Sequence, residues 1–140
     1  MTVALVVRRI IGASAEQLFE AWTQPAQLRQ WWGPAGVECT HAEVDLRVGG
    51  AYRIANRFPD GRIVWITGTF ELIDAPHRLA YTWQIDPASS AERVTVEFEP
   101  RGRKTEVIVT HERIQSEAAR EEHARGWTGC LDGLVKYAGR

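Results

Sequence analysis

The sequence has few cysteines, almost no charge imbalance and no long hydrophobic run. Its 140 residues include only two cysteines, Cys39 and Cys130, which are too few for a disulfide framework. The 17 basic and 18 acidic residues leave a net charge of -1, and no basic cluster is present that could neutralise a phosphate backbone. No apolar run approaches the roughly 18 residues that can span a bilayer. We therefore expect a cytoplasmic protein with no nucleic-acid partner and no membrane insertion.

Motifs for metal, nucleotide or nucleophile chemistry are also missing from the sequence. The four histidines, His41, His77, His111 and His123, do not have the spacing of metal ligands. There is no glycine-rich phosphate loop after a strand and no nucleophile elbow. Cys130 has no obvious activating neighbour, so it reads as a buried core residue. The sequence predicts no metal site and no cofactor.

What the sequence does contain is one long helical pattern, from Ser116 to Tyr137. Ser116 is a helix-capping residue, and an apolar stripe with helical spacing follows it, made of Trp127, Cys130, Leu131, Leu134, Val135 and Ala138. Gly126, Gly129 and Gly133 lie beside this stripe, although each glycine costs a helix about 1 kcal/mol relative to alanine. Either this helix packs closely on a sheet, or helix and sheet stand apart over part of their length and enclose a pocket.

The rest of the chain reads as strands, apart from two short helices. A first strand is expected at Thr2–Ile11, a helix with the capping-box pair Ser14 and Gln17 follows it, and a second short helix starts near Pro25. Six runs of alternating apolar residues then predict strands at Val37–Leu46, Ala51–Phe58, Arg62–Ile73 and Arg78–Ile85, around Val94–Phe98, and at Thr105–His111. We therefore predict one α+β domain over residues 1–140, in which a seven-stranded curved antiparallel sheet wraps around the long C-terminal helix.

Several short motifs in this order resemble a known family. They are Phe19-Glu20-Ala21-Trp22, Trp31-Trp32-Gly33-Pro34, Asp45-Leu46-Arg47-Val48-Gly49-Gly50 and Gly126-Trp127. Together they resemble the bacterial family related to the C-terminal domain of the activator of heat-shock-protein-90 ATPase, within the helix-grip (START-like, SRPBCC) superfamily. The resemblance covers nearly the whole chain and implies a helix-grip fold with a cavity between sheet and long helix for a small apolar molecule. Such a fold hosts many functions, so it does not by itself identify an activity.

Large aromatic residues on the expected inward faces are the candidate ligand-binding residues. They are Trp31, Tyr52, Phe70, Tyr81, Trp83 and Trp127, since pockets for small molecules are mostly apolar with few polar groups. Any one of them could instead simply fill the core. Trp65 is expected on the opposite face, where it could contribute to a homodimer.

Two histidines are the candidate polar groups of this pocket. His111 continues the inward face of the last strand, and His123 lies one helical turn before Trp127. Each is either a satisfied core residue, or a hydrogen-bonding or acid–base group at the pocket. Cys39, His41 and Glu43 share one face of a strand, but the sequence does not indicate whether that face is inside or outside.

The leading functional hypothesis is binding of a small hydrophobic or aromatic ligand. The alternatives are a cofactor-free cyclase, dehydratase or hydrolase that uses His111 or His123 as acid–base, and a co-chaperone-like ATPase activator in a stress response, which rests on the family name alone. No catalytic residue is assigned from the sequence.

Overall fold

The computed structural model describes residues 1–85 and 90–139. Its elements, in chain order, are β1 (Val3–Ile11), α1 (Ala15–Thr23), α2 (Pro25–Trp31), β2 (Glu38–Val44), β3 (Ala51–Arg57), β4 (Ile63–Asp74), β5 (Arg78–Trp83), β6 (Glu92–Arg101), β7 (Lys104–Ile114) and α3 (Glu117–Ala138). The elements follow the order predicted from the sequence, and their boundaries differ by only a few residues.

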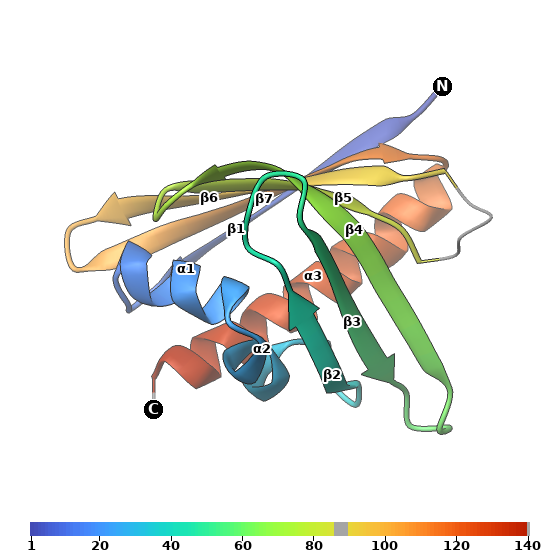
Figure 1. Cartoon of the computed structure of the whole chain (residues 1–140), viewed down its shortest axis with the longest axis horizontal. Coiled ribbons are helices and arrows are strands. Elements are labelled where there is room, and N and C mark those ends of the chain that lie inside the picture. Colours follow the sequence, from blue (N-terminus) through green and yellow to red (C-terminus); the bar gives the residue numbers. More distant parts are fainter. Residues whose placement is uncertain (86–89, 140) are drawn as a thin grey trace.

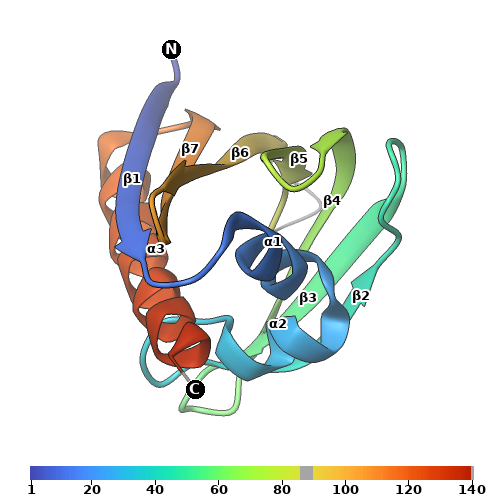
Figure 2. The ribbon, with the colours of Figure 1, turned by 90° about the vertical axis from the view of Figure 1, so that its left-hand side faces the viewer.

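The seven strands form one antiparallel sheet in the order β1-β7-β6-β5-β4-β3-β2. The sheet is strongly curved, and α3 runs across its concave side (Figure 1). The two short helices lie within the curve and close one end of it (Figure 2). This is the predicted α+β helix-grip architecture, which is confirmed. Among the described residues, none of the helices has the length and apolar character needed to span a bilayer.

Side-chain caps explain where α1 and α3 begin. Ser14 Oγ accepts a hydrogen bond from the Gln17 backbone N–H at 3.1 Å, and the Gln17 side chain accepts one from the Ser14 N–H at 3.0 Å. This is the reciprocal capping box that the sequence predicts. Ser116 Oγ likewise accepts from the Ala119 N–H at 3.1 Å, so both helices satisfy an otherwise unpaired donor in the first turn.

The core lies between the concave face of the sheet and the apolar stripe of α3. Its most deeply buried side chains include Leu79, Val94, Val96, Phe98, Val107, Val109, Leu131 and Leu134. The residues of this set on β6 and β7 alternate along each strand, as expected for a sheet with one face buried. The same alternation decides which polar residues face α3.

A register shift in β2 answers a question that the sequence left open. The pairing of β2 with β3 is irregular between Cys39 and His41, so that Cys39 turns inward and is buried while His41 and Glu43 are exposed. An extra residue in one strand has this effect because successive side chains alternate between the two faces.

Two glycines of α3 allow this helix to lie very close to another part of the chain. A Cβ at Gly129 would lie 2.6 Å from Pro34 Cβ, and a Cβ at Gly133 would lie 2.6 Å from the Trp31 carbonyl oxygen. These two glycines therefore face the end of α2 and the segment that follows it, and not the strands that the first of the two alternatives placed against them. Gly126 is different, because a Cβ there would meet nothing within 4 Å.

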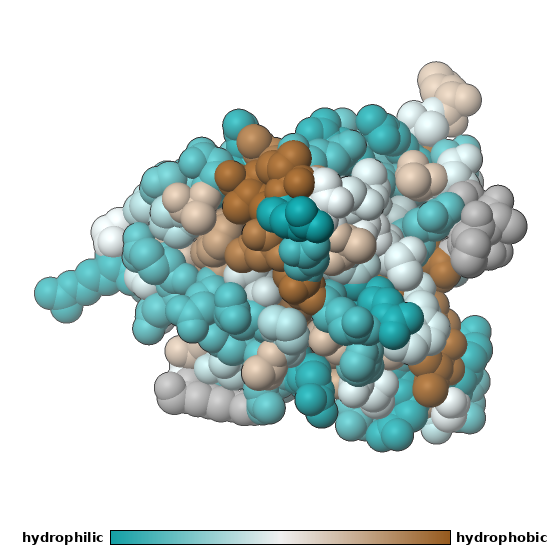
Figure 3. Space-filling model, in the orientation of Figure 1, coloured by the Kyte–Doolittle hydropathy of each residue, from teal (hydrophilic) through white to brown (hydrophobic). Residues whose placement is uncertain are grey.

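The outer surface carries some apolar side chains. Hydrophobic residues gather where the loop between β2 and β3 lies (Figure 3), and this loop carries the exposed Leu46 and Val48. Trp65 is 37% exposed on β4, and the Arg53 guanidinium lies 4.7 Å from the centre of its ring. Trp65 therefore points away from α3, on the sheet face where the sequence analysis placed it.

Candidate functional site

An open cleft of about 400 Å³ lies between α3 and the sheet. The sheet contributes residues of β3, β4 and β5, the segment after α2 forms a third wall, and α3 contributes the residues around Gly126. The lining residues are Trp32, Pro34, Val37, Asn56, Phe58, Val64, Ile66, Trp83, Ile85, Glu122, His123, Arg125, Gly126, Trp127 and Cys130. A Cβ at Gly126 would meet nothing within 4 Å, so at this point the structure agrees with the second alternative, in which helix and sheet stand apart over part of their length.

A second, much smaller space lies deeper between the sheet and the short helices. It holds about 20 Å³ and is lined by Trp22, Leu28, Trp32, Val44, Tyr52, Ile54, Phe70, Tyr81 and Trp83. This volume is enough for about one water molecule. An aromatic ring therefore fits the outer cleft and not the inner space.

Trp32 and Trp83 line both spaces and so form the wall between them. Their ring centres are 6.2 Å apart. Both side chains are more than nine-tenths buried, yet neither indole N–H has a hydrogen-bond partner among the described residues. The amide oxygen of Asn56, which also lines the cleft, is buried and unpaired as well.

The other buried tryptophans contrast with this pair. Trp22 donates its indole N–H to the Tyr81 hydroxyl at 3.2 Å, and Trp31 donates to the Ala21 carbonyl at 2.9 Å. Trp127 donates to Nδ1 of His111 at 3.0 Å. A buried polar group without a partner costs about 1–3 kcal/mol. The unpaired atoms of Trp32, Trp83 and Asn56, gathered around one cleft, therefore mark it as a candidate binding site.

A chain of hydrogen bonds links Trp127 to the edge of the cleft. Nε2 of the fully buried His111 lies 2.6 Å from Oε1 of Glu92. Nε2 of His123 lies 3.1 Å from the same oxygen. The two imidazole rings stack with centres 4.5 Å apart. One carboxylate oxygen of Glu92 therefore contacts two histidine side chains, His111 from the sheet and His123 from α3.

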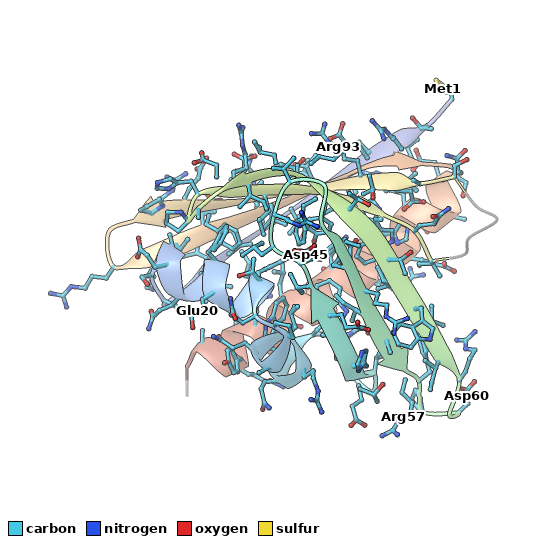
Figure 4. All side chains as sticks on the ribbon, viewed as in Figure 1. Met1, Glu20, Asp45, Arg57, Asp60 and Arg93 are labelled. Carbon is cyan, nitrogen blue, oxygen red and sulfur yellow. The ribbon has the colours of Figure 1, made fainter. Side chains whose placement is uncertain are left out.

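The strand register explains why Glu92 faces inward. Its neighbour Arg93 projects from the outer side of the sheet, away from α3 (Figure 4). Since successive side chains on a strand alternate, Glu92 shares the inward face of Val94 and Val96. Sequence reasoning missed Glu92, although extending the alternation of β6 back by two residues would have found it.

The surroundings set the charges of this cluster. Burial alone would raise the pKa of the Glu92 carboxyl, but the hydrogen bonds from His111 and His123 outweigh it and lower this pKa to about 2. Burial lowers the pKa of His111, against the opposing effect of the Glu92 carboxylate. At neutral pH Glu92 is therefore ionised and His111 is neutral. His111 then donates its Nε2–H to Glu92 and accepts the Trp127 N–H at Nδ1.

Glu92, His111 and His123 also lie close enough to be tested as a metal site. One ligand atom from each falls within 4.8 Å of the others. A neutral histidine that binds a metal through Nε2 carries its hydrogen on Nδ1, whereas Nδ1 of His111 is the acceptor of the Trp127 N–H. This donor set fits a hydrogen-bonded chain better than a metal site, so the prediction that no metal is bound is retained as a prediction.

The eight predicted ligand-binding residues fall into three groups. Trp83, His123 and Trp127 line the cleft, while Tyr52, Phe70 and Tyr81 line the small inner space together with Trp83. Trp31 and His111 belong to neither set of lining residues, although His111 lies directly behind Trp127. Among the residues that the prediction lacked are Trp32 and Asn56, with unpaired polar atoms, and Glu92, which joins the two histidines.

The buried cysteine of the cleft lacks the surroundings of a reactive thiol. Cys130 lines the cleft, and burial raises the pKa of its thiol to about 12. The thiol therefore stays protonated at neutral pH, and a thiolate is the reactive form of cysteine. The cleft's titratable chemistry accordingly rests on its histidine and carboxylate groups.

Comparisons with known proteins agree with this fold. A family model described as activator of Hsp90 ATPase homolog 1-like protein matches residues 12–139. Protein CV1439 from Chromobacterium violaceum superposes with a TM-score of 0.90 at 24% identity, covering 98% of this chain and 97% of its own. The AHSA1 protein SPO3351 from Silicibacter pomeroyi has a TM-score of 0.86 at 23% identity, with 96% of each chain covered.

A third similar structure is the AHSA1-like protein from Aeromonas hydrophila, with a TM-score of 0.83 at 26% identity, covering 96% of this chain and 91% of its own. Identities this low establish a shared fold and carry no residue roles. The search of curated proteins found none that matches this chain.

Proposed function

Because the chain belongs to the family of activator of Hsp90 ATPase homologue 1-like proteins, we propose that it binds a small hydrophobic or aromatic molecule in the cleft between the sheet and α3. The fold of this family commonly binds small ligands. The cleft's volume of about 400 Å³ falls within the range of sites for small molecules. Its walls are mainly apolar and aromatic, with few polar groups, which suits a flat apolar ligand.

One observation carries the proposal, namely the set of unpaired polar atoms around the cleft. Two indole N–H groups, of Trp32 and Trp83, and one amide oxygen, of Asn56, are buried without partners. Leaving them unpaired costs stability, and a ligand with an oxygen atom offers an acceptor to the indoles. The preferred ligand is therefore an aromatic or alicyclic body that carries a carbonyl or hydroxyl group.

Native mass spectrometry of freshly purified protein tests whether such a ligand is carried through purification. Titration with naphthol, a flat aromatic alcohol, tests the site directly through the indole N–H signals in a ¹H–¹⁵N spectrum. The signals of Trp32 and Trp83 are expected to shift, while those of Trp22 and Trp31 stay in place, because the latter two already donate to protein oxygens.

A matched pair of variants separates the cleft from the outer surface. Trp83→Phe should weaken naphthol binding, because it removes an unpaired donor from the cleft wall. Trp65→Phe should leave it unchanged, because Trp65 is on the outer sheet face. Naphthol that shifts none of the cleft indoles, or that shifts the Trp65 signal alone, contradicts the proposed site.

The remaining expectations about partners follow from the same proposal. A cytoplasmic setting suits Cys39 and Cys130, which are both free thiols. A homodimer through the outer face around Trp65 stays a prediction, and sedimentation velocity of the wild type and of Trp65→Ser tests it. A co-chaperone role in a stress response draws on none of the contacts described above and ranks below ligand binding.

A further inference from the structure

His123 stands at the cleft with one ring nitrogen engaged and the other free. Its Nε2 lies 3.1 Å from Oε1 of Glu92, and a lone pair at that distance from a carboxylate would be repelled. Nε2 therefore carries a hydrogen, and in the neutral ring Nδ1 carries the lone pair. No hydrogen bond to Nδ1 of His123 is found among the described residues.

The second histidine of the cluster cannot take this role. His111 is fully buried, donates to Glu92 through Nε2 and accepts the Trp127 N–H at Nδ1, so both of its nitrogens are occupied. Since His111 already gives the Glu92 carboxylate a partner, the cluster would be satisfied without His123. The added contact therefore orients a histidine that is partly exposed and lines the cleft.

Two indole rings with unpaired N–H groups lie near this base. The ring of Trp83 packs edge-on against His123, with centres 6.3 Å apart, and its indole N–H is unpaired. Trp32 also has an unpaired indole N–H, and its ring centre lies 6.2 Å from that of Trp83. Proton transfer beside a carbonyl group requires a base and a donor for the carbonyl oxygen, and His123 and the two neighbouring indole rings can supply them to a ligand bound against both.

We propose that His123, oriented by Glu92, is a catalytic base that moves a proton to and from the carbon next to a ketone group of a ligand in the cleft, with the ketone oxygen held by the indole N–H of Trp83. This inference rests on the proposed binding function and adds an activity to it. The substrate class is a flat aromatic or alicyclic ketone.

The step needs no oxidant, metal or second substrate. The carbon–hydrogen bond next to the carbonyl breaks and its proton goes to Nδ1 of His123. The electron pair of that bond forms the carbon–carbon double bond of the enolate, and the carbonyl π pair moves to oxygen, where the Trp83 N–H stabilises the charge. Return of the proton to the same carbon gives exchange with solvent, and return to a conjugated carbon gives an isomer.

Glu92 acts through His123 and is a positioning residue. Its carboxylate holds the tautomer that leaves Nδ1 free and stabilises the imidazolium that forms, as a carboxylate does behind a catalytic histidine. The other charged groups that line the cleft beside His123 are Glu122 and Arg125, both on α3. His111 faces it from β7 as a neutral ring.

Exchange of carbon-bound hydrogen in deuterium oxide tests the proposal. Indanone and β-tetralone, two flat aryl-fused ketones, are incubated with the whole protein, and loss of their α-proton signals is followed by NMR. Wild-type protein should accelerate the exchange well beyond free imidazole at the same concentration. His123→Gln should slow it by roughly a hundredfold, the lower end of what a positioned acid–base group contributes, and added imidazole should partly restore exchange in His123→Ala.

The matched control is the other histidine–glutamate pair. His41 Nε2 lies 2.8 Å from Glu43 on the outer sheet face, so His41→Gln should leave the exchange rate unchanged. Glu92→Gln should lower the rate at saturating ketone while the affinity for the ketone stays the same, a split that a purely structural role would not produce. Circular dichroism checks that each variant remains folded.

The outcomes separate this inference from the binding function. If neither naphthol nor either ketone perturbs the indole signals of Trp32 or Trp83, ligand binding in the cleft is refuted and the inference falls with it. If naphthol shifts these signals and the ketones do not, the proposed reaction on a ketone is overturned and the binding function stands. If a ketone binds but exchanges no faster than with free imidazole, or exchanges equally fast in His123→Gln, the catalytic role is overturned and the binding function stands.

Discussion

The indole N–H of Trp127 donates a hydrogen bond to Nδ1 of His111 at 3.0 Å, so that α3 is joined to β7 inside the core. This bond fixes the tautomer of a fully buried histidine and directs its Nε2–H to Glu92. The same carboxylate then receives His123 at the cleft. One interaction between helix and sheet thus organises the polar groups of the candidate site, and its consequences can be measured.

Loss of the Trp127 donor should destabilise the protein. In Trp127→Phe the Nδ1 atom of His111 stays buried without a partner, and such an atom costs about 1–3 kcal/mol. Urea denaturation of the variant measures the loss. Trp65→Phe is the matched control on the outer face, where a change within about 0.5 kcal/mol is expected. Equal losses in the two variants would show that the hydrogen bond to His111 contributes nothing.

Mild acid should destabilise the protein through His111. Its pKa is lowered by burial from the ordinary value of 6.5. Below about pH 6.5 this histidine therefore binds a proton more readily in the unfolded chain than in the folded chain. As a result, the free energy of unfolding falls as the pH falls. Urea denaturation between about pH 7 and pH 5 measures the slope. His111→Phe should be less stable but should show a shallower slope, and an unchanged slope would contradict the assignment.

Glu92 should add a second loss of stability at lower pH. Its folded pKa of about 2 lies below the ordinary value of 4.5, so its contribution is present above about pH 4.5 and is lost as the pH falls towards 2. Acid unfolding followed by circular dichroism should show this second window, and Glu92→Gln should remove it. A Glu92→Gln protein with the wild-type acid profile would rule out the depressed pKa.

Two glycines of α3 should respond in opposite directions to the same substitution. Gly129→Ala should destabilise the fold, because the new Cβ would lie 2.6 Å from Pro34 Cβ and 2.8 Å from Pro34 Cα. Gly126→Ala should stabilise it by up to about 1 kcal/mol, because the helix gains propensity and the Cβ meets nothing within 4 Å. Thermal denaturation of both variants makes the comparison, and the same sign of change in both would refute it.

Replacing Asn56 by an apolar residue should weaken ligand binding without lowering stability. Its amide oxygen is buried and unpaired at the cleft, so Asn56→Leu should leave the free energy of unfolding unchanged or raise it. The same substitution should weaken the binding of naphthol, whose hydroxyl can donate to the amide oxygen. Isothermal titration calorimetry measures the affinity. A variant that loses stability and keeps its affinity would place Asn56 in the scaffold.

Local patterns in the sequence were enough to predict the elements and their order. The capping box at Ser14 and Gln17, the cap at Ser116, and the alternation along β5 to β7 are short-range signals, because each depends on residues a few positions apart. They place α3 after a run of strands, and the family motifs agree with that arrangement. The inward positions of Trp83, His123 and Trp127 follow from the same periodicities.

The tertiary structure alone decided which of these residues meet. Glu92, His111 and His123 come from β6, β7 and α3, and no spacing along the chain states that three such elements converge on one oxygen atom. The bulge that turns Cys39 inward and His41 outward depends on pairing with β3. Gly129 and Gly133 of α3 lie against Pro34 and Trp31 rather than against strands. Hydrophobic periodicity determines which face of a helix or strand a residue occupies. The residue that it contacts there is determined by how segments distant in the sequence pack together.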